Sequence, residues 1–209
     1  MRRETSIISE CISTLVARYS IIKEKNEIEE LVVRLNKEYP LDVGILSVFM
    51  LNYLKLNIGE AIYLAANEPH AYLSGECIEC MASSDNVVRA GLTPKYKDVN
   101  NLVNMLTYNT GIPQKLNPIN IDNYSVNYIP PIDEFMLRRS ILPANTKNYI
   151  FPKLSGPSLL LVFSGNTKIN DTLVLNKGSV VYLPSDTSIV ISNENTSENL
   201  ELYTCSTNL

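Results

Sequence analysis

The chain has 209 residues, of which 45% are hydrophobic and 19% charged, and its formal net charge is -4. This length suffices to bury one large core or two small ones. Because acidic residues outnumber basic ones, the chain lacks the excess of positive charge with which proteins bind nucleic acid. No apolar run is long enough to span a bilayer. Glu4 and Glu10 stand where a signal peptide would be apolar, so we expect a cytoplasmic protein with neither nucleic acid nor membrane as a partner.

The N-terminal part of the sequence has apolar residues at helical spacing. One set recurs over residues 8–19, and a second, over 28–35, follows a first turn rich in Glu. These patterns predict two amphipathic helices whose apolar stripes form core. Pro40 ends the second helix, and Asp42 is suited to cap a third over residues 43–51.

From residue 52 onward the pattern changes to short apolar runs separated by turn signals. Runs such as YLKL, AIYLA, HAYL, CIECMA and VVRAG predict several strands, and helix returns only near 99–105. A stretch rich in Asn, Pro and Gly over 108–123 predicts a linker or a long crossing loop, after which strands resume. We therefore expect a mainly β fold in three parts: a helical segment over 1–52, a β region with its linker over 53–122, and a β domain over 123–209.

An internal repeat connects the two β regions. GEAIYLAANEPHAY, which starts at Gly59, aligns without a gap with GSVVYLPSDTSIVI, which starts at Gly178. The two strings share a plan of glycine, strand, tight turn and strand. The second string has isoleucines where the first has His70 and Tyr72. We expect the first copy to carry a site and the second to fill its interior with aliphatic side chains.

The chain's single histidine lies in a cluster of polar residues in the first β region. His70 and Tyr72 are two apart on a predicted strand and therefore share a face. Glu79, Asp85 and Arg89, on the neighbouring predicted strands, are geometrically consistent with a polar barrel interior. Each residue could instead have a purely structural role. His70 would then lie in a turn, Tyr72 would be a core aromatic, and Arg89 and Asp85 would form an ion pair. Their joint occurrence favours a site.

The cysteines give a weaker signal. Cys77 and Cys80 have no second pair at metal spacing, and on a strand their thiols would point to opposite faces. Cys11 and Cys205 lie far from them in sequence, so the four form no evident disulfide framework. With one imidazole, the chain offers too few ligands for a complete metal site.

The string NEPHAYLSGECIECMASSDNVVRAGLTPK, followed by DVNNLVNMLTY, resembles the type I phosphomannose isomerases of the cupin superfamily. The resemblance runs over most of the chain, and HAY followed by RAGLTPK carries it most specifically. It implies zinc-dependent interconversion of mannose 6-phosphate and fructose 6-phosphate, an aldose-ketose isomerisation that feeds GDP-mannose synthesis. It also implies an incomplete catalytic cupin barrel and a second, metal-free cupin-like barrel toward the C-terminus.

The same resemblance assigns roles to residues of the cluster. It implies that His70 is a zinc ligand, that Arg89 is the catalytic arginine, and that four residues line the sugar-phosphate pocket: Tyr72, Glu79, Asp85 and Lys95. It assigns no general base to this chain.

The chain also departs from the family's pattern. The remaining zinc ligands of those enzymes, a Gln-x-His pair and a Glu, belong to an N-terminal half that has no counterpart in this sequence. We therefore expect the C-terminal portion of an isomerase, either a truncated chain that begins at an internal Met or a chain that needs a complementing half, and we expect it to be inactive alone. The alternative is a metal-free sugar-phosphate-binding or structural cupin module, and metal content separates the two.

Overall fold

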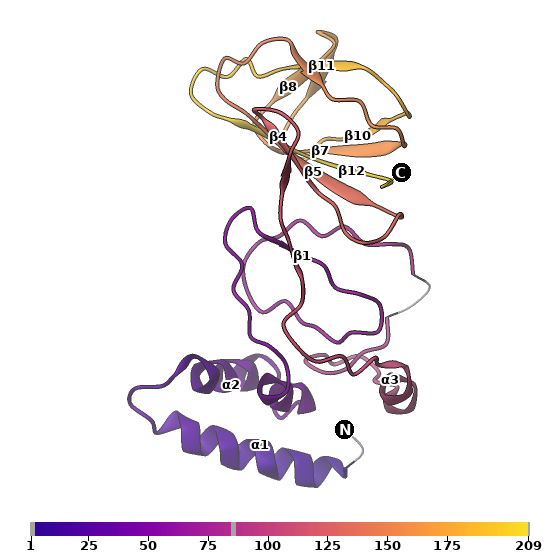
Figure 1. Ribbon diagram of the computed structural model, residues 1–209. Coiled ribbons are helices and arrows are strands. Elements are labelled where there is room, and N and C mark those ends of the chain that lie inside the picture. The colour runs from indigo at the N-terminus through magenta and orange to yellow at the C-terminus, as the bar shows by residue number, and fades with distance from the viewer. Residues whose placement is uncertain (1–2, 85–86, 209) are drawn as a thin grey trace. The chain divides into compact units, whose positions relative to one another are not determined.

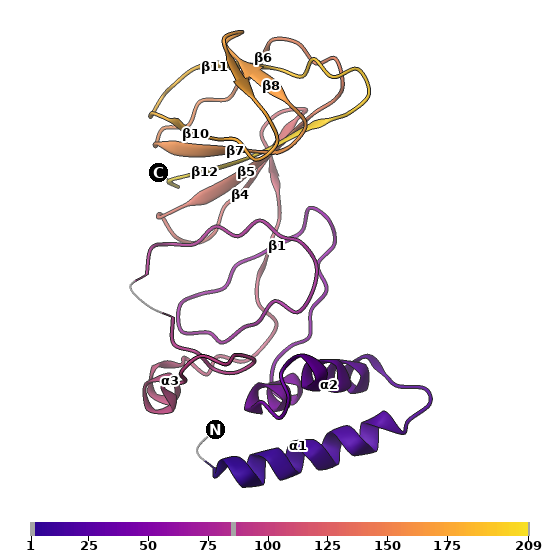
Figure 2. The same ribbon diagram turned by 180° about the vertical axis from the view of Figure 1, so that it is seen from behind.

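The computed structural model describes residues 3–84 and 87–208, which divide into two compact units (Figures 1 and 2). The first unit comprises Met1–Lys55, Leu64–Gly75 and Ser84–Pro113. The second comprises Leu56–Tyr63, Glu76–Ser83 and Gln114–Leu209. Each unit therefore contains segments that are separated in sequence. None of the helices in the described residues has the length and apolar character needed to cross a membrane.

Two α-helices open the first unit, as their periodicity predicts: α1 (Thr5–Ser20) and α2 (Glu27–Glu38). The side chain of Asn26 accepts hydrogen bonds from the amides of Ile28 and Glu29, both at 3.0 Å, and the Glu29 carboxylate accepts from the Asn26 amide at 2.9 Å. This capping box satisfies amides that have no partner within the helix. The helix ends before Pro40, which confirms the predicted stop.

Two shorter helices complete this unit: η1 (Val43–Phe49) and α3 (Val99–Met105). Asp42 caps η1, as predicted, and accepts a hydrogen bond from the amide of Gly44 at 2.7 Å. The third helix is a 3-10 helix, because glycine and β-branched valines favour the α-helix poorly. The helices bury one apolar cluster of five residues: Ile12, Leu31, Val32, Leu35 and Ile45.

The segment between β1 (Ala61–Ile62) and α3 does not form the strands predicted for a catalytic half-barrel. Among its described residues, 63–84 and 87–98, none is in a helix or a strand, and Figure 1 draws them as long loops. Strands are stable only when a neighbour pairs with their backbone groups. The apolar residues of HAYL and VVRAG thus predicted an extended chain, but within the described residues no second strand pairs with either run.

The second unit is built from antiparallel strands. A small sheet pairs β1 with β2 (Lys115–Leu116). A six-stranded sheet has the order β10-β7-β12-β5-β4-β3, and a four-stranded sheet has the order β6-β11-β8-β9. Their strands are β3 (Ile119–Asn120), β4 (Ser125–Tyr128), β5 (Met136–Leu142), β6 (Tyr149–Phe151), β7 (Ser158–Ser164), β8 (Thr167–Ile169), β9 (Leu173–Leu175), β10 (Val180–Leu183), β11 (Ile189–Ser192) and β12 (Leu200–Ser206).

The two larger sheets enclose the main core but do not close into a barrel. Strands β5 and β12 bury every second residue, so one face of the six-stranded sheet points to the core. No ladder joins that sheet to the four-stranded one within the described residues, so the cupin-like barrel expected toward the C-terminus is not closed by strand pairing. Closure needs continuous pairing around the sheet, and the four-stranded sheet begins and ends with three-residue strands.

A buried arginine accompanies this apolar core. Arg138 is 3% exposed, its Nε donates to Oδ1 of Asn127 at 2.9 Å, and one terminal nitrogen donates to the Pro152 carbonyl at 2.6 Å. Its guanidinium lies 5.3 Å from the ring centroid of Phe151. Burial lowers the pKa of Arg138. Neutral acceptors and an aromatic face thus replace the water that a buried guanidinium loses.

The internal repeat is visible in the backbone. Gly59 and Gly178 both have φ 86°, and eight residues later Asn67 and Asp186 have φ 63° and 56°. The turns before the paired strands also match, because Glu60 N bonds to Asn57 O at 3.0 Å and Ser179 N to the carbonyl of the aligned asparagine at 2.9 Å. The second copy fills the core as predicted, since its two isoleucines, at positions 189 and 191, are buried.

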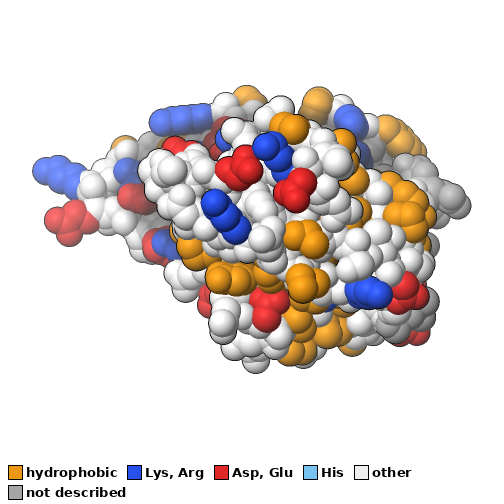
Figure 3. All heavy atoms as spheres, turned by 90° about the horizontal axis from the view of Figure 1, so that it is seen from above, with side chains coloured by type: hydrophobic (Ala, Val, Ile, Leu, Met, Phe, Trp, Pro, Cys, Tyr) orange, Lys and Arg blue, Asp and Glu red, His pale blue; other side chains and the backbone are white. Residues whose placement is uncertain are grey.

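The surface mixes both signs of charge with apolar side chains. In the space-filling view of Figure 3, blue and red side chains lie interspersed, with orange side chains between them. Apolar side chains also stand exposed on strands of the second unit: Ile150, Leu159, Phe163, Leu173, Val174, Val180 and Tyr182. The face in Figure 3 therefore carries no extended field of one sign.

Candidate functional site

His70 lies on the exposed part of the first unit, just after a turn at residues 66–67. Its Nδ1 is 2.9 Å from the carbonyl oxygen of Glu68. Because a carbonyl only accepts, Nδ1 is the donor in this contact, and Nε2 is the nitrogen that it leaves available. Metal-binding histidines commonly have this arrangement, with one ring nitrogen held by a carbonyl and the other free to coordinate.

Tyr72 lies next to His70. The two ring centroids are 5.8 Å apart and the rings are tilted by 44°. Residues two apart in an extended chain place their side chains on the same face, so this contact follows from the local backbone although no strand forms. The Tyr72 side chain is 60% exposed.

Contacts within the first unit hold the segment that carries these two rings. The Leu73 carbonyl accepts a hydrogen bond from the Arg34 side chain at 3.3 Å, and the Leu73 side chain packs on the helical core. The side chain of Asn109 donates a hydrogen bond to the Glu68 carboxylate at 3.0 Å. The Thr107 amide donates one to the Asn67 carbonyl at 3.3 Å. The backbone around His70 is thus fixed at both ends.

Asp42 holds the second segment of interest, which runs from Arg89 to Lys95. Its Oδ1 accepts the amide of Leu92 at 2.8 Å, in addition to the helix-capping bond, and its Oδ2 accepts from Lys97 Nζ at 2.9 Å. Burial acts to raise the pKa of Asp42, but the two amide bonds and the ammonium of Lys97 outweigh it and lower that pKa. Asp42 therefore positions the arginine-bearing segment, a role that its sequence context did not predict.

Two glycines bring the same segment against η1. A Cβ on Gly91 would lie 2.6 Å from the Cα of Gly44, and one on Gly44 would lie 2.7 Å from the amide nitrogen of Leu92. Only glycine permits two backbones to approach this closely. The contact sits two residues from Arg89, so it sets the path of the chain there.

The structure brings only some of the predicted site residues together. His70 and Tyr72 are in contact, and Arg89, half-buried, and Lys95, exposed, lie on a segment of the same unit. Glu79 is exposed and belongs to the second unit. Asp85 lies outside the described residues. The expected convergence of the six on one pocket stays a prediction.

The described residues fit zinc as one ligand and not as a complete site. They contain no group of three His, Cys, Asp or Glu side chains that could hold a metal ion. His70 supplies one imidazole, whose Nδ1 is held by the Glu68 carbonyl and whose Nε2 would be the coordinating nitrogen. A tetrahedral zinc site needs three or four protein ligands, so further ligands would come from outside the described residues.

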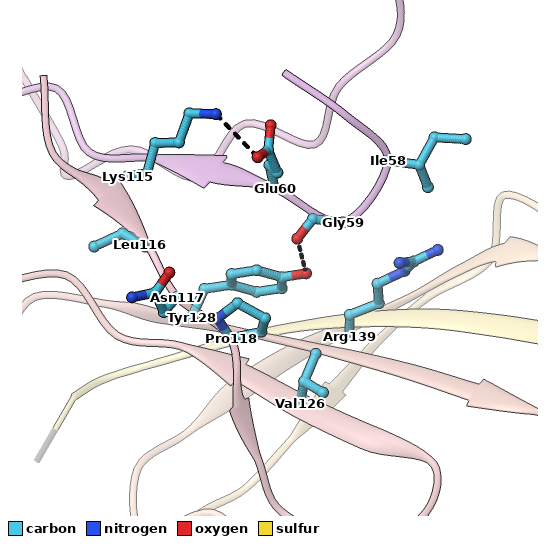
Figure 4. A pocket seen from close by; sticks show the side chains of 10 residues that line it. All are labelled: Ile58, Gly59, Glu60, Lys115, Leu116, Asn117, Pro118, Val126, Tyr128 and Arg139. Carbon is cyan, nitrogen blue, oxygen red and sulfur yellow. Dashed lines mark hydrogen bonds and ion pairs between the residues drawn. The ribbon is translucent and has the colours of Figure 1, made fainter. Parts of the chain in front are cut away.

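A separate cavity of about 370 Å³ lies in the second unit (Figure 4). Its polar lining includes Lys115, which pairs with Glu60 at 2.9 Å, and Arg139, which pairs with Glu201 at 2.8 Å. Figure 4 also shows the Tyr128 hydroxyl directed at the Gly59 carbonyl, a hydrogen bond of 2.7 Å. Because carboxylates neutralise both cations, this cavity offers no unpaired positive charge to a phosphate group.

Curated proteins of known function include sequence relatives of this chain. No protein-family model matches the chain. It is 47% identical over 184 residues to mannose-6-phosphate isomerase 2 of Arabidopsis thaliana, covering 87% of this chain and 41% of that protein. It is 42% identical over 209 residues to mannose-6-phosphate isomerase 1 of the same plant, covering 97% and 48%. The chain thus spans about half the length of these curated relatives.

Solved structures agree with the sequence relatives. A mannose 6-phosphate isomerase from Salmonella typhimurium, bound to fructose 6-phosphate and zinc, superposes with a TM-score of 0.79 and 27% identity over 100% of this chain and 52% of that one. The apo form of that enzyme gives a TM-score of 0.77. In sequence and in fold, the chain is a homologue of the type I mannose-6-phosphate isomerases and belongs to their family.

Proposed function

We propose that this chain supplies the substrate-binding portion of a zinc-dependent mannose-6-phosphate isomerase, which converts mannose 6-phosphate to fructose 6-phosphate. The observation that carries the proposal is the similarity to curated isomerases across 97% of the chain, which includes the segment from His70 to Lys95. The solved relative bound to fructose 6-phosphate and zinc supports the same reaction. The expected cytoplasmic location and the place in GDP-mannose synthesis are part of this proposal.

The reaction assigns distinct tasks to the side chains. It moves a proton between C1 and C2 of the sugar, and negative charge develops on the oxygens in the transition state. Zinc held in part by Nε2 of His70 would polarise those oxygens. The guanidinium of Arg89 would stabilise the developing oxyanion or grip the phosphate in bidentate fashion. Lys95 would add a point charge at the phosphate, and Tyr72 would line the sugar-phosphate pocket. Glu79 or Asp85 would orient Arg89 or the sugar hydroxyls.

The proposal requires ligands that this chain lacks, so its test is complementation. A polypeptide that bears the Gln-x-His and Glu ligands is added to the purified chain, and zinc content and conversion of mannose 6-phosphate are measured. Both are expected to appear in the mixture and in neither component alone. If the mixture binds sugar phosphate without zinc or turnover, the chain is the metal-free binding or structural module instead.

Variants in the complemented mixture separate the roles. Arg89→Ala should reduce kcat by at least about 100-fold with zinc content unchanged, because the arginine acts on the transition state. His70→Ala should remove zinc and turnover together. Arg89→Lys should not rescue, because an ammonium cannot reproduce the planar fork of a guanidinium. Full activity of Arg89→Ala would show that the arginine has another role.

A further inference from the structure

Two of the four cysteines meet within the second unit. The Sγ atoms of Cys80 and Cys205 are 2.9 Å apart, although 125 positions separate them in sequence. The sulfur atoms of a disulfide are about 2.0 Å apart, so a small movement would join them. Both residues are half-buried, whereas Cys11 and Cys77 are exposed. The spacing of the cysteines along the chain gave no sign of this contact.

The two partners differ in freedom. Cys205 lies on β12, which pairs on both sides, with Leu137 of β5 and Leu159 of β7 opposite it. Cys80 lies on the segment Glu76–Ser83, whose residues belong to no helix or strand. The strand therefore holds one sulfur in place while the irregular segment can bring the other closer.

The contact also changes the acidity of both thiols. The hydrogen bond between the two thiols lowers the pKa of Cys205, although burial acts to raise it. The same bond, together with burial, raises the pKa of Cys80. The thiolate is the nucleophile in thiol-disulfide exchange, and the 2.9 Å contact places the second thiol to resolve a mixed disulfide whichever sulfur attacks first.

We propose that Cys80 and Cys205 form a redox-modifiable pair that small-molecule disulfides convert to an intramolecular disulfide. The thiolate of one cysteine of the pair attacks one sulfur of the small disulfide, whose S–S bond breaks and releases one thiol. The other cysteine, losing its proton to solvent, then attacks the protein sulfur of the mixed disulfide and releases the second thiol. Two protein thiols are oxidised and one small disulfide is reduced to two thiols. This inference does not depend on the proposed isomerase activity.

The bond would tie the irregular segment to the sheet. Cys80 directly follows Glu79 in sequence, so the oxidised state would restrain the backbone that carries this candidate site residue. A cross-link between residues so distant in sequence also restricts the unfolded chain strongly.

The experiment uses the purified 209-residue chain and oxidised glutathione as the probe. After incubation at pH 7.5 the remaining thiols are blocked with iodoacetamide, and the unreduced protein is digested with an endopeptidase that cleaves after Glu. Cleavage after Glu79 places Cys77 and Cys80 on different peptides, which trypsin would not do. We expect loss of two of the four thiols, a Cys80–Cys205 linked peptide, and an upward shift of Tm by about 5 °C that dithiothreitol reverses.

Serine variants supply the controls. Cys77→Ser should keep the linked peptide and the Tm shift, whereas Cys80→Ser should stop at a glutathione adduct on Cys205 and lose the shift. Cys205→Ser and, should serine disturb the strand, Cys205→Ala should both lose the linked peptide. A link that involves Cys77, or glutathione adducts confined to Cys11 and Cys77 with the other two thiols intact, would overturn the proposal.

Discussion

Asp42 is the residue on which two segments of the first unit depend. It caps η1 and holds the amide of Leu92, which is 50 positions away in sequence. Its folded pKa is lowered, so its ionised form stabilises the fold above its unfolded pKa of about 4, and this contribution is lost as the pH falls through the folded pKa. Asp42→Asn should therefore reduce the free energy of unfolding by about 1–2 kcal/mol at pH 7.

The measurement is urea unfolding at pH 7 and at pH 3. The difference between the Asp42→Asn variant and the parent chain should shrink at pH 3, because below a pKa of about 4 the unfolded carboxylate binds a proton more readily than the folded one. Asp186→Asn is a matched control, because Asp186 is exposed and sits at a left-handed turn position that asparagine tolerates. A difference that stays constant with pH would mean that the charge of Asp42 contributes nothing.

Arg138 permits a second test at this scale. Asn127→Ala would leave its Nε without the acceptor at 2.9 Å, at a cost of about 1–3 kcal/mol. Arg138→Met should also destabilise, because it orphans the Asn127 and Pro152 acceptors, but the double variant Arg138→Met with Asn127→Leu should recover part of the loss. Strictly additive effects in guanidinium unfolding would show that the two side chains act independently.

At the scale of elements, η1 and the arginine-bearing segment can come into contact because Gly44 and Gly91 each carry a hydrogen atom in place of a side chain. Gly91→Ala would place a methyl group 2.6 Å from the Gly44 backbone, so one segment must move. We expect a loss of about 2 kcal/mol or more in unfolding free energy and, in the complemented enzyme, reduced kcat. Gly75→Ala is the control, because its methyl group meets nothing within 4 Å and costs only the strain of φ +104°. Equal losses would rule out the packing explanation.

Elements also differ in how well the sequence predicted them. The two helices have periodic apolar faces and capping signals, and β5, β7, β10, β11 and β12 have alternating or continuous apolar runs, so local pattern sufficed for them. Strands β2 and β3, two residues each, lie in the stretch interpreted as a linker. The predicted strands around His70 and Arg89 failed because pairing is a property of two segments, and sequence alternation describes only one.

The candidate site follows the same rule. The contact of His70 with Tyr72 is local and was predictable from their spacing. Two other contacts join residues that are far apart in sequence. Asp42 accepts a hydrogen bond from Leu92, 50 positions away, and Cys80 contacts Cys205, 125 positions away. No local sequence pattern predicts either contact. The roles of Glu79, Asp85, Arg89 and Lys95 remain predictions from family resemblance.

At the scale of the whole molecule, metal content is the decisive observable. One neutral imidazole has a small fraction of the affinity of a four-ligand site, and the described residues contain no group of three ligands. The purified chain alone should hold well under one zinc per molecule and should not convert mannose 6-phosphate. Elemental analysis after dialysis against micromolar zinc checks this, with the His70→Ala variant as the background. Stoichiometric zinc in the chain alone would contradict it.

The repeated turns give the molecule an internal reference for backbone strain. Gly59 and Gly178 share φ 86°, yet a Cβ at Gly59 would lie 3.3 Å from a terminal nitrogen of Arg139 while one at Gly178 would meet nothing within 4 Å. Gly178→Ala should therefore report the strain alone, about 1 kcal/mol, and Gly59→Ala the strain plus the crowding of Arg139. Subtracting one unfolding free energy from the other isolates the crowding within a single chain. The duplicated turn thus supplies its own control within one chain.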